Sequence, residues 1–236
     1  MRTLKRLTRH LKDKLQQAGQ SLTREANQAT KSVISSCADE FGAFLERIAE
    51  QHRLEWRERM AIHEAGHATL AWRSPSIKRI VITEIREYDG RVMARDTSFP
   101  TNISNWYMLS MALAGIAAEL QVVGKSQMLT AKYDLQRAHK LATDLVAQGQ
   151  DATSPPWGTE PDIEGMEDIS RAFRIEPPDQ EKRVLACGYK HAKTVLAENR
   201  SGLLNLAGTL YRQGRLDHAE VIAILGPRPF DERLLF

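Results

Sequence analysis

The sequence has only two cysteines and no long uninterrupted apolar run. Cys37 and Cys187 lie far apart in a chain of 236 residues and lack the spacing of paired metal ligands. No secretory apolar segment opens the chain, and no window approaches the roughly 18 consecutive apolar residues that span a bilayer. We therefore expect reduced, buried cysteines, a cytoplasmic location, and membrane attachment that is peripheral or made through a partner.

A phosphate-binding loop is also missing from the sequence. The pattern Gly-x-x-x-x-Gly-Lys does not occur, and no internal repeat is present. Hydrophobic residues make up 42% and charged residues 27% of the chain, which is typical of a globular protein long enough to bury a core. We expect no nucleotide and no nucleic acid among its partners.

Basic charge is concentrated at the start of the chain. Residues 1–31 hold eight Lys or Arg against two acidic residues, whereas the whole chain has a net charge of only +3. Leucines at near-helical spacing predict a basic amphipathic helix there, and the helical pattern continues through residues 32–54. We therefore expect a helical N-terminal arm over residues 1–54. Three uses stay open for residues 1–31: peripheral membrane contact, self-association as a coiled coil, or packing on the chain's own domain.

The most informative stretch is His63-Glu64-Ala65-Gly66-His67. It lies in a proline-free run from Glu55 to Trp72 that predicts a helix ending before Pro75. Residues four apart share one face of a helix, so both imidazoles can reach a single metal ion. Glu64 is turned partly aside, where its carboxylate can take a proton from zinc-bound water. This layout is typical of zinc metallopeptidases, and the alternative is a pair of structural histidines satisfied by hydrogen bonds.

A catalytic zinc needs a third protein ligand from elsewhere in the chain. In one class of sites a His follows the second His by six residues, but that position is Arg73, which excludes the class. Carboxylates on later helices are the other candidates. Glu119 lies on a largely apolar predicted helix and Asp134 lies early in the next one, and spacing alone leaves both open.

The rest of the chain predicts a mainly helical domain over residues 55–236 with a small β-hairpin. Strands are expected at residues 77–85 and 91–94 around the turn signal Asp89-Gly90. This hairpin either offers its free edge to an extended substrate or only covers the motif helix. Residues 149–180 are rich in proline and glycine and are expected to be irregular. Helices are expected from Ser104 or Asn105 to Gly124, from a Thr130 cap to about 146, and over 179–199, 202–212 and Asp217 to Leu225.

Three segments together resemble the protease domain of the FtsH family, peptidase family M41. They are His63-Glu64-Ala65-Gly66-His67-Ala68, Ala114-Gly115-Ile116-Ala117-Ala118-Glu119 and Thr130-Ala131-Lys132-Tyr133-Asp134-Leu135-Gln136-Arg137-Ala138, in the family's order and spacing. The C-terminal run 192–200 and the short helix at 216–225 also resemble that domain. The resemblance therefore covers residues 55–226.

This resemblance implies a role for each residue of the candidate site. His63, His67 and Asp134 would be the zinc ligands, Glu64 the base that activates water, and Glu119 a partner that orients a ligating imidazole. The resemblance also implies a mainly helical fold with a small sheet, and cleavage of polypeptides with little sequence preference. The other histidines do not lie in a metal-ligand motif and are expected at the surface or hydrogen-bonded in the core; they are His10, His52, His139, His191 and His218.

The sequence departs from the family pattern in several places. The AAA ATPase module and the transmembrane anchor that normally precede this domain are not found, and residues 1–54 stand in their place. Lys132-Tyr133 occurs where the family usually has a small residue and Asn, and Ile116 replaces a usual Arg. These changes alter the cleft rather than the ligands.

The expected function is an ATP-independent zinc metalloendopeptidase that hydrolyses peptide bonds in flexible or unfolded proteins. The alternative is a non-catalytic FtsH-like module for binding or regulation, attached to a membrane or to a larger protease. The intact His63, Glu64, His67 and Asp134 favour the enzyme, because a scaffold has no physical need for that base.

Overall fold

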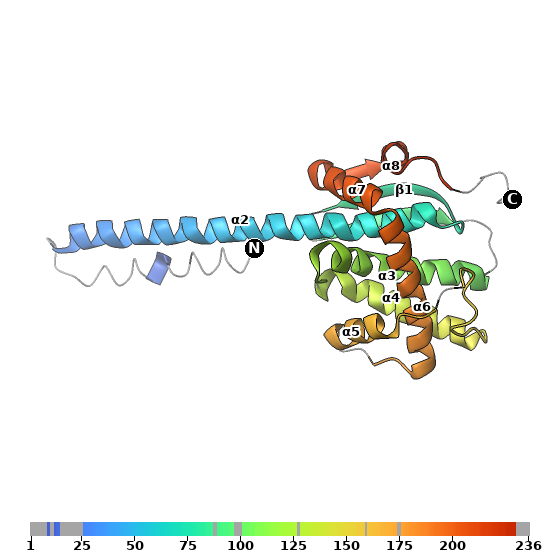
Figure 1. The fold of residues 1–236 in the computed structure, drawn as a ribbon. Coiled ribbons are helices and arrows are strands. Elements are labelled where there is room, and N and C mark those ends of the chain that lie inside the picture. Colours follow the sequence, from blue (N-terminus) through green and yellow to red (C-terminus); the bar gives the residue numbers. More distant parts are fainter. Residues whose placement is uncertain are drawn as a thin grey trace. The chain divides into compact units, whose positions relative to one another are not determined.

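The computed structural model describes residues 9, 12–14, 26–86, 89–96, 101–126, 128–158, 160–173 and 176–229. These residues form a mainly helical structure with one small antiparallel sheet, as the sequence predicts (Figure 1). The chain divides into two compact units, Met1–Trp56 and Arg57–Phe236. Most of residues 1–31 lie outside the described part, and so does the basic amphipathic helix expected there.

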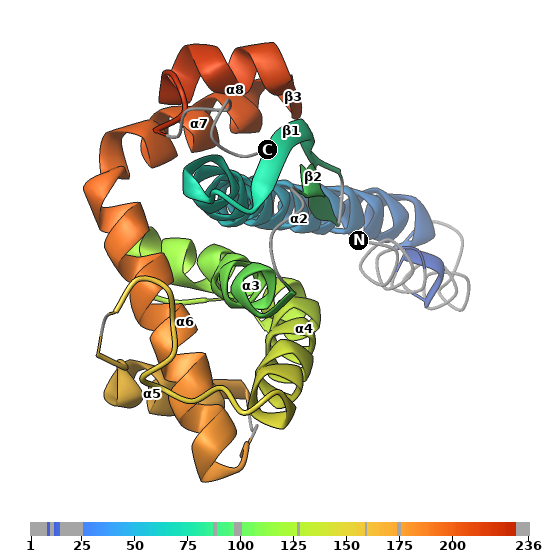
Figure 2. The ribbon, with the colours of Figure 1, turned by 90° about the vertical axis from the view of Figure 1, so that its right-hand side faces the viewer.

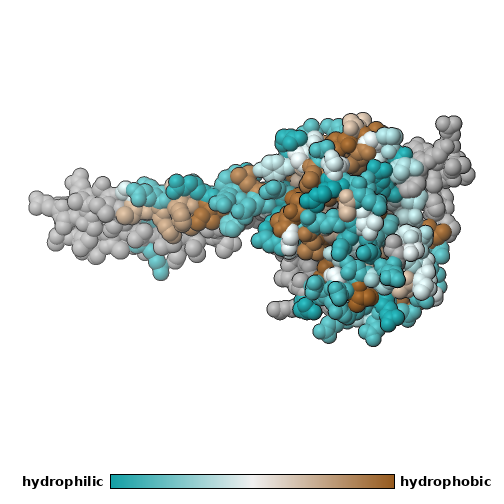
Figure 3. Space-filling model, viewed as in Figure 1, coloured by the Kyte–Doolittle hydropathy of each residue, from teal (hydrophilic) through white to brown (hydrophobic). Residues whose placement is uncertain are grey.

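In the first unit, the described side chains belong mainly to the early part of helix α2 (Ala26–Arg73). Most of the side chains from residue 36 to residue 56 are exposed or half-buried, including Phe41 at 43% and Phe44 at 49% exposure. Figure 3 shows a band of apolar residues beside polar ones over this part of the helix. Cys37 is exposed, so its expected burial is wrong, whereas Cys187 in the second unit is buried as expected.

In the second unit, α2 is the central element. Every residue from Met60 to Trp72 is buried, and a helix that is buried all round must lie between two layers. One layer holds the sheet with the two C-terminal helices, and the other holds α3 (Thr101–Val123), α4 (Met128–Ala147) and α6 (Asp179–Glu198) (Figure 2). The helix ends at Arg73, two residues before Pro75, in agreement with the sequence.

The sheet has three strands in the order β2-β1-β3, with both pairings antiparallel. β1 (Ile77–Ile85) and β2 (Gly90–Asp96) form the hairpin expected from the sequence. β3 (Arg215–Asp217) was not expected, because three residues between two helices carry no alternating pattern. It joins the C-terminal helices to β1.

The opposite layer is built around α3 (Thr101–Val123), which packs against α4 (Met128–Ala147) and α6 (Asp179–Glu198). By length and mean hydropathy alone, Asn102–Val123 could cross a membrane, although its apolar residues are not consecutive. Of the most apolar window within this span, 67% is buried inside the protein. In this structure α3 is therefore a core helix.

Two features of this layer differ from the sequence-based expectation. α5 (Ile163–Phe173) is a helix inside the stretch expected to be irregular. Met166 and Ile169, three residues apart, are buried in the core. The flanking prolines and Gly165 favour a loop in the sequence, and they hide this short helical pattern. α3 and α4 begin earlier than expected: α3 starts before Ser104, and α4 starts at Met128, so Thr130 lies inside α4 and is not its cap.

The C-terminal helices are α7 (Arg200–Gln213) and α8 (His218–Leu225). Asp217 caps α8, as predicted: its side chain accepts a hydrogen bond from the Glu220 N–H, and the Glu220 side chain accepts one from the Asp217 N–H. This capping box fixes the junction between β3 and α8.

Candidate metal centre

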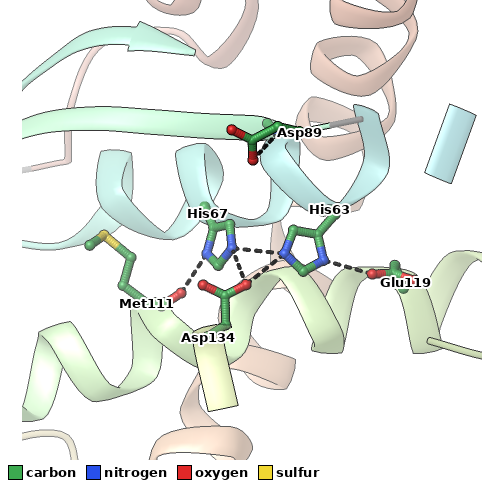
Figure 4. A network of polar contacts seen from close by, with 7 residues as sticks. His63, His67, Asp89, Met111, Glu119 and Asp134 are labelled. Atoms are coloured by element: carbon green, nitrogen blue, oxygen red, sulfur yellow. Dashed lines mark hydrogen bonds and ion pairs between the residues drawn. The ribbon is translucent and has the colours of Figure 1, made fainter. Parts of the chain in front are cut away.

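Two imidazoles and one carboxylate converge in the second unit. His63 and His67 lie on the buried segment of α2, and Asp134 lies on α4 (Figure 4). The two Nε2 atoms are 3.1 Å apart, and Asp134 Oδ2 lies 2.8 Å from His63 Nε2 and 3.3 Å from His67 Nε2. One potential ligand atom from each residue lies within 4.8 Å of the others, so the cluster could hold a metal ion.

The outer nitrogens of both rings are fixed by groups on α3. His67 Nδ1 lies 2.7 Å from the carbonyl oxygen of Met111, and because a carbonyl only accepts, Nδ1 carries the hydrogen. His63 Nδ1 lies 2.6 Å from Glu119 Oε1, and that carboxylate is fully buried. Both rings therefore direct Nε2 to the same point, which is the arrangement that metal-ligating histidines usually have.

Two glycines allow α2 and α3 to approach this closely. A Cβ atom at Gly115 would lie 2.4 Å from His63 Nε2, and one at Gly66 would lie 2.6 Å from the carbonyl oxygen of Ala114. Any larger side chain at either position would push the helices apart. Gly66 and Gly115, which both lie in segments that resemble the FtsH family, thus have a direct role in packing α2 against α3.

The protonation of the cluster reflects competing effects. Burial disfavours the charged form of His63, but hydrogen bonds to Asp134 and Glu119 outweigh burial and raise its pKa to about 10. Burial acts in the same way on His67, whose pKa is nevertheless raised by Asp134. Burial also works against ionised Asp134, yet the two histidines hold its pKa well below its usual range. The point where the ligand atoms meet therefore favours a positive charge.

Glu64 lies beside this cluster but bonds to none of it in the described structure. It is 4% exposed, and its Oε2 is buried without a hydrogen-bond partner among the described residues. Burial raises the pKa of Glu64, and the charges of His67 and His63 oppose that rise. A carboxyl with a raised pKa is suited to accept and return a proton near neutral pH.

The cluster is open to solvent mainly through its third member. The exposed fraction of the side chain is 2% for His63, 11% for His67 and 23% for Asp134. Tyr133, the residue before Asp134, is 77% exposed. A ligand from solution would therefore reach the cluster from the side of α4.

The remaining described histidines have other surroundings. His191 stacks on Trp157 at 3.8 Å between ring centroids and lies 2.8 Å from Ser110 Oγ, and His139 Nδ1 lies 3.2 Å from Glu181. His10 lies outside the described residues. Sequence reasoning missed three groups that shape the site: the Met111 carbonyl, Gly115, and Gly90, where an added Cβ atom would lie 2.5 Å from Glu64 Oε1. A backbone carbonyl leaves no sequence signal, whereas a glycine inside an apolar helix or a strand does.

No protein-family model matches the chain. The chain is 36% identical over 187 residues to a protein of Symbiobacterium thermophilum named ATP-dependent zinc metalloprotease FtsH 1, and the match covers 74% of the chain and 30% of that protein. It is 28% identical over 216 residues to the mitochondrial inner membrane m-AAA protease component yta12 of Schizosaccharomyces pombe, covering 87% of the chain and 28% of the relative.

A third relative is the ATP-dependent zinc metalloprotease FtsH of Parabacteroides distasonis, 26% identical over 220 residues, with 86% of the chain and 31% of the relative covered. The chain thus spans about 30% of the length of these curated relatives. These similarities confirm the resemblance indicated by the motifs: the chain is a relative of the FtsH zinc metalloproteases over a part of their length.

Proposed function

We propose that this chain is a zinc metalloendopeptidase that hydrolyses peptide bonds in flexible or unfolded polypeptides without ATP. The observation that carries the proposal is the convergence of His63 Nε2, His67 Nε2 and Asp134 Oδ2 beside a buried carboxylate oxygen of Glu64 that has no hydrogen-bond partner among the described residues. Two imidazole nitrogens and one carboxylate oxygen are a donor set that suits catalytic zinc. The choice of zinc and of proteolysis is supported by the relatives, which are named zinc metalloproteases.

Each residue then has a distinct role. His63, His67 and Asp134 would hold the ion, while Glu119 and the Met111 carbonyl keep the two imidazoles oriented. Bound zinc supplies a Lewis acid that polarises a carbonyl and lowers the pKa of water. Glu64 accepts the proton of the attacking water and delivers it to the leaving amine.

The sheet supports an extended polypeptide as the substrate. β2 pairs only with β1 in the described part of the chain, so its outer edge has free backbone groups. An extended peptide can add to such an edge as a further strand, and β2 begins next to Glu64. Hydrolysis without ATP is proposed because the roles given to Glu64 and to the metal cluster need no nucleotide.

The test of the base is the substitution Glu64→Gln. It keeps the size of the side chain but removes its ability to accept a proton, so we expect digestion of a reduced, unfolded protein to slow by at least about 100-fold. Zinc content of the two proteins is measured by elemental analysis and matched before the assay. Equal cleavage at equal zinc content would refute the role of Glu64.

The test of the metal site is Asp134→Ala. We expect one zinc ion per chain in the wild type and substoichiometric zinc in the variant, because two imidazoles alone bind zinc weakly. Asp144→Ala, on the same helix, is the matched control and should retain zinc. Full zinc content in Asp134→Ala would show that another group completes the ligand set.

The proposed location is the cytoplasm, with residues 1–31 attaching the chain peripherally to an anionic membrane or to a second copy. Flotation with anionic liposomes, with and without residues 1–31, tests the membrane contact. Equal flotation of the two forms would exclude it, and light scattering on the same two forms tests self-association.

A further inference from the structure

We propose that Gly90 is a positioning residue for Glu64. The backbone of this first residue of β2 would hold the Glu64 carboxylate in the orientation in which it exchanges protons. The inference rests on the proposed function, because it assigns a support to the proposed base. Gly90 itself would touch no substrate atom and would act only through Glu64.

The contact between the two residues is unusually close. A Cβ atom built on Gly90 would lie 2.5 Å from Glu64 Oε1, 2.6 Å from its Cγ and 2.8 Å from its Cδ. All three nearest atoms belong to one side chain, and that side chain is 4% exposed on a helical segment buried on every side. An added methyl group would therefore either turn the carboxylate away from its place or lift the hairpin.

Backbone conformation does not explain the glycine. Gly90 is absent from the described glycines with positive φ, which are Gly124, Gly149, Gly158, Gly214 and Gly226. It lies in strand β2 and pairs with Ile85 across the hairpin, so any residue could adopt its backbone geometry. The sequence suggested Asp89-Gly90 as a turn signal, but the structure gives Gly90 a packing reason instead.

The position of Gly90 is itself fixed by the hairpin. The Gly90 N–H donates to Asp89 Oδ1 at 2.9 Å (Figure 4), and the Arg86 N–H donates to the Asp89 carbonyl at 2.6 Å. The Ile85 N–H in turn donates to the Gly214 carbonyl at 2.8 Å. The backbone of Gly90 is therefore held in place by the hydrogen bonds of the hairpin.

Packing is the main restraint on the Glu64 carboxylate. Oε1 faces Gly90, and Oε2 is buried with no hydrogen-bond partner among the described residues, so the contact with Gly90 limits how the carboxylate can turn. A base misplaced by about 1 Å can lose on the order of 100-fold in rate, although zinc and substrate still bind. Loss of the Gly90 contact should therefore lower kcat and leave KM and zinc content nearly unchanged.

The experiment is a double-mutant cycle on Gly90→Ala and Glu64→Asp. We expect Gly90→Ala to lower kcat by about 30-fold or more in the wild-type background. In the Glu64→Asp background the carboxylate is one methylene shorter and leaves room for the new methyl group, so Gly90→Ala should change kcat by less than about 3-fold. Gly208→Ala, in α7, is the control and should leave kcat unchanged in both backgrounds.

A stability cycle tests the same contact without any activity. Gly90→Ala should destabilise the wild type in urea but have little effect in a Glu64→Ala background, where the crowded side chain is gone. Equal losses in both backgrounds, in kcat and in stability, would overturn the inference. Activity of Glu64→Gln at full zinc content would instead overturn the proposed function, so the two failures are distinguishable.

Discussion

The orientation of the two imidazoles depends on groups that would not touch the metal. Glu119 and the Met111 carbonyl each occupy the outer nitrogen of one ring, which leaves both Nε2 atoms directed at Asp134. Glu119 is a charged residue on a core helix and is fully buried. Its position in the protein interior is best explained by its bond to His63, since an isolated buried carboxylate would be costly.

This arrangement predicts the effect of Glu119→Gln. The amide oxygen can still accept from His63 Nδ1, but the negative charge that makes the imidazole a stronger ligand is lost. We expect the dissociation constant for zinc to rise about 10- to 100-fold, measured by competition with a chromophoric chelator. Glu84→Gln, at another buried carboxylate outside the cluster, should leave zinc affinity unchanged. An unaltered affinity in Glu119→Gln would contradict the role of Glu119.

His191 predicts how stability depends on pH. Burial lowers the pKa of His191 to about 4, whereas an unfolded chain has the ordinary value of about 6.5. The unfolded state therefore binds more protons between these values, so stability is fully present above pH 6.5 and falls as the pH drops towards 4.

We expect the wild type to lose about 2–3 kcal/mol more than His191→Phe between pH 7 and pH 4, measured by urea unfolding. Phenylalanine keeps a ring stacked on Trp157 but cannot titrate. Parallel pH profiles for the two proteins would mean that His191 is protonated equally in the folded and unfolded states.

At the scale of elements, the crossing of α2 and α3 determines whether the site can form. A Cβ atom at Gly66 would meet the Ala114 carbonyl oxygen and the Ala118 Cβ, both at 2.6 Å, and a helix backbone cannot move aside locally. We expect Gly66→Ala to destabilise the protein by about 1–3 kcal/mol in urea unfolding with a chelator present.

Gly208→Ala is the matched control for this substitution. Its new methyl group would approach only the flexible end of Arg212, at 3.5 Å, so the better helix propensity of alanine should stabilise α7 by up to about 1 kcal/mol. The opposite signs of the two effects separate helix crossing from helix propensity. A neutral Gly66→Ala would show that α2 and α3 can shift apart freely.

The elements that could be predicted from the sequence are those with a strong local signal. The helix that carries His63, the hairpin of β1 and β2, and the Asp217 cap all follow from periodicity, β-branching and capping chemistry. β3 could not be predicted because its pairing with β1 is a tertiary contact between short segments. α5 was missed because its flanking prolines resemble a loop.

The candidate site was predictable in part. Spacing indicated His63 and His67 as a pair, and the family resemblance selected Asp134, which the structure brings within hydrogen-bond distance of both. Binding of zinc by these three residues stays a prediction. The contribution of the Met111 carbonyl could not be predicted, because every residue has such a group and only the helix crossing selects one.

At the scale of the whole molecule, the proposed metal joins α2 to α4 and should stabilise the second unit. With free zinc at about 100 times its dissociation constant, the folded state gains about 2.7 kcal/mol, which corresponds to a rise in Tm on the order of 5–10 °C. Differential scanning calorimetry with zinc and after dialysis against EDTA measures this shift. Asp134→Ala should show the same Tm under both conditions, and a zinc-dependent rise in that variant would contradict the assignment.

The burial of α2 between two layers has a consequence for the proposed peptidase. Both histidines and Glu64 lie on that one segment, so the first separation of the layers would dismantle the candidate site as well as the core. A molecule that began to unfold would thus lose the proposed activity before it was unfolded enough to be cleaved. Unfolding and loss of the proposed activity would therefore be one event rather than two.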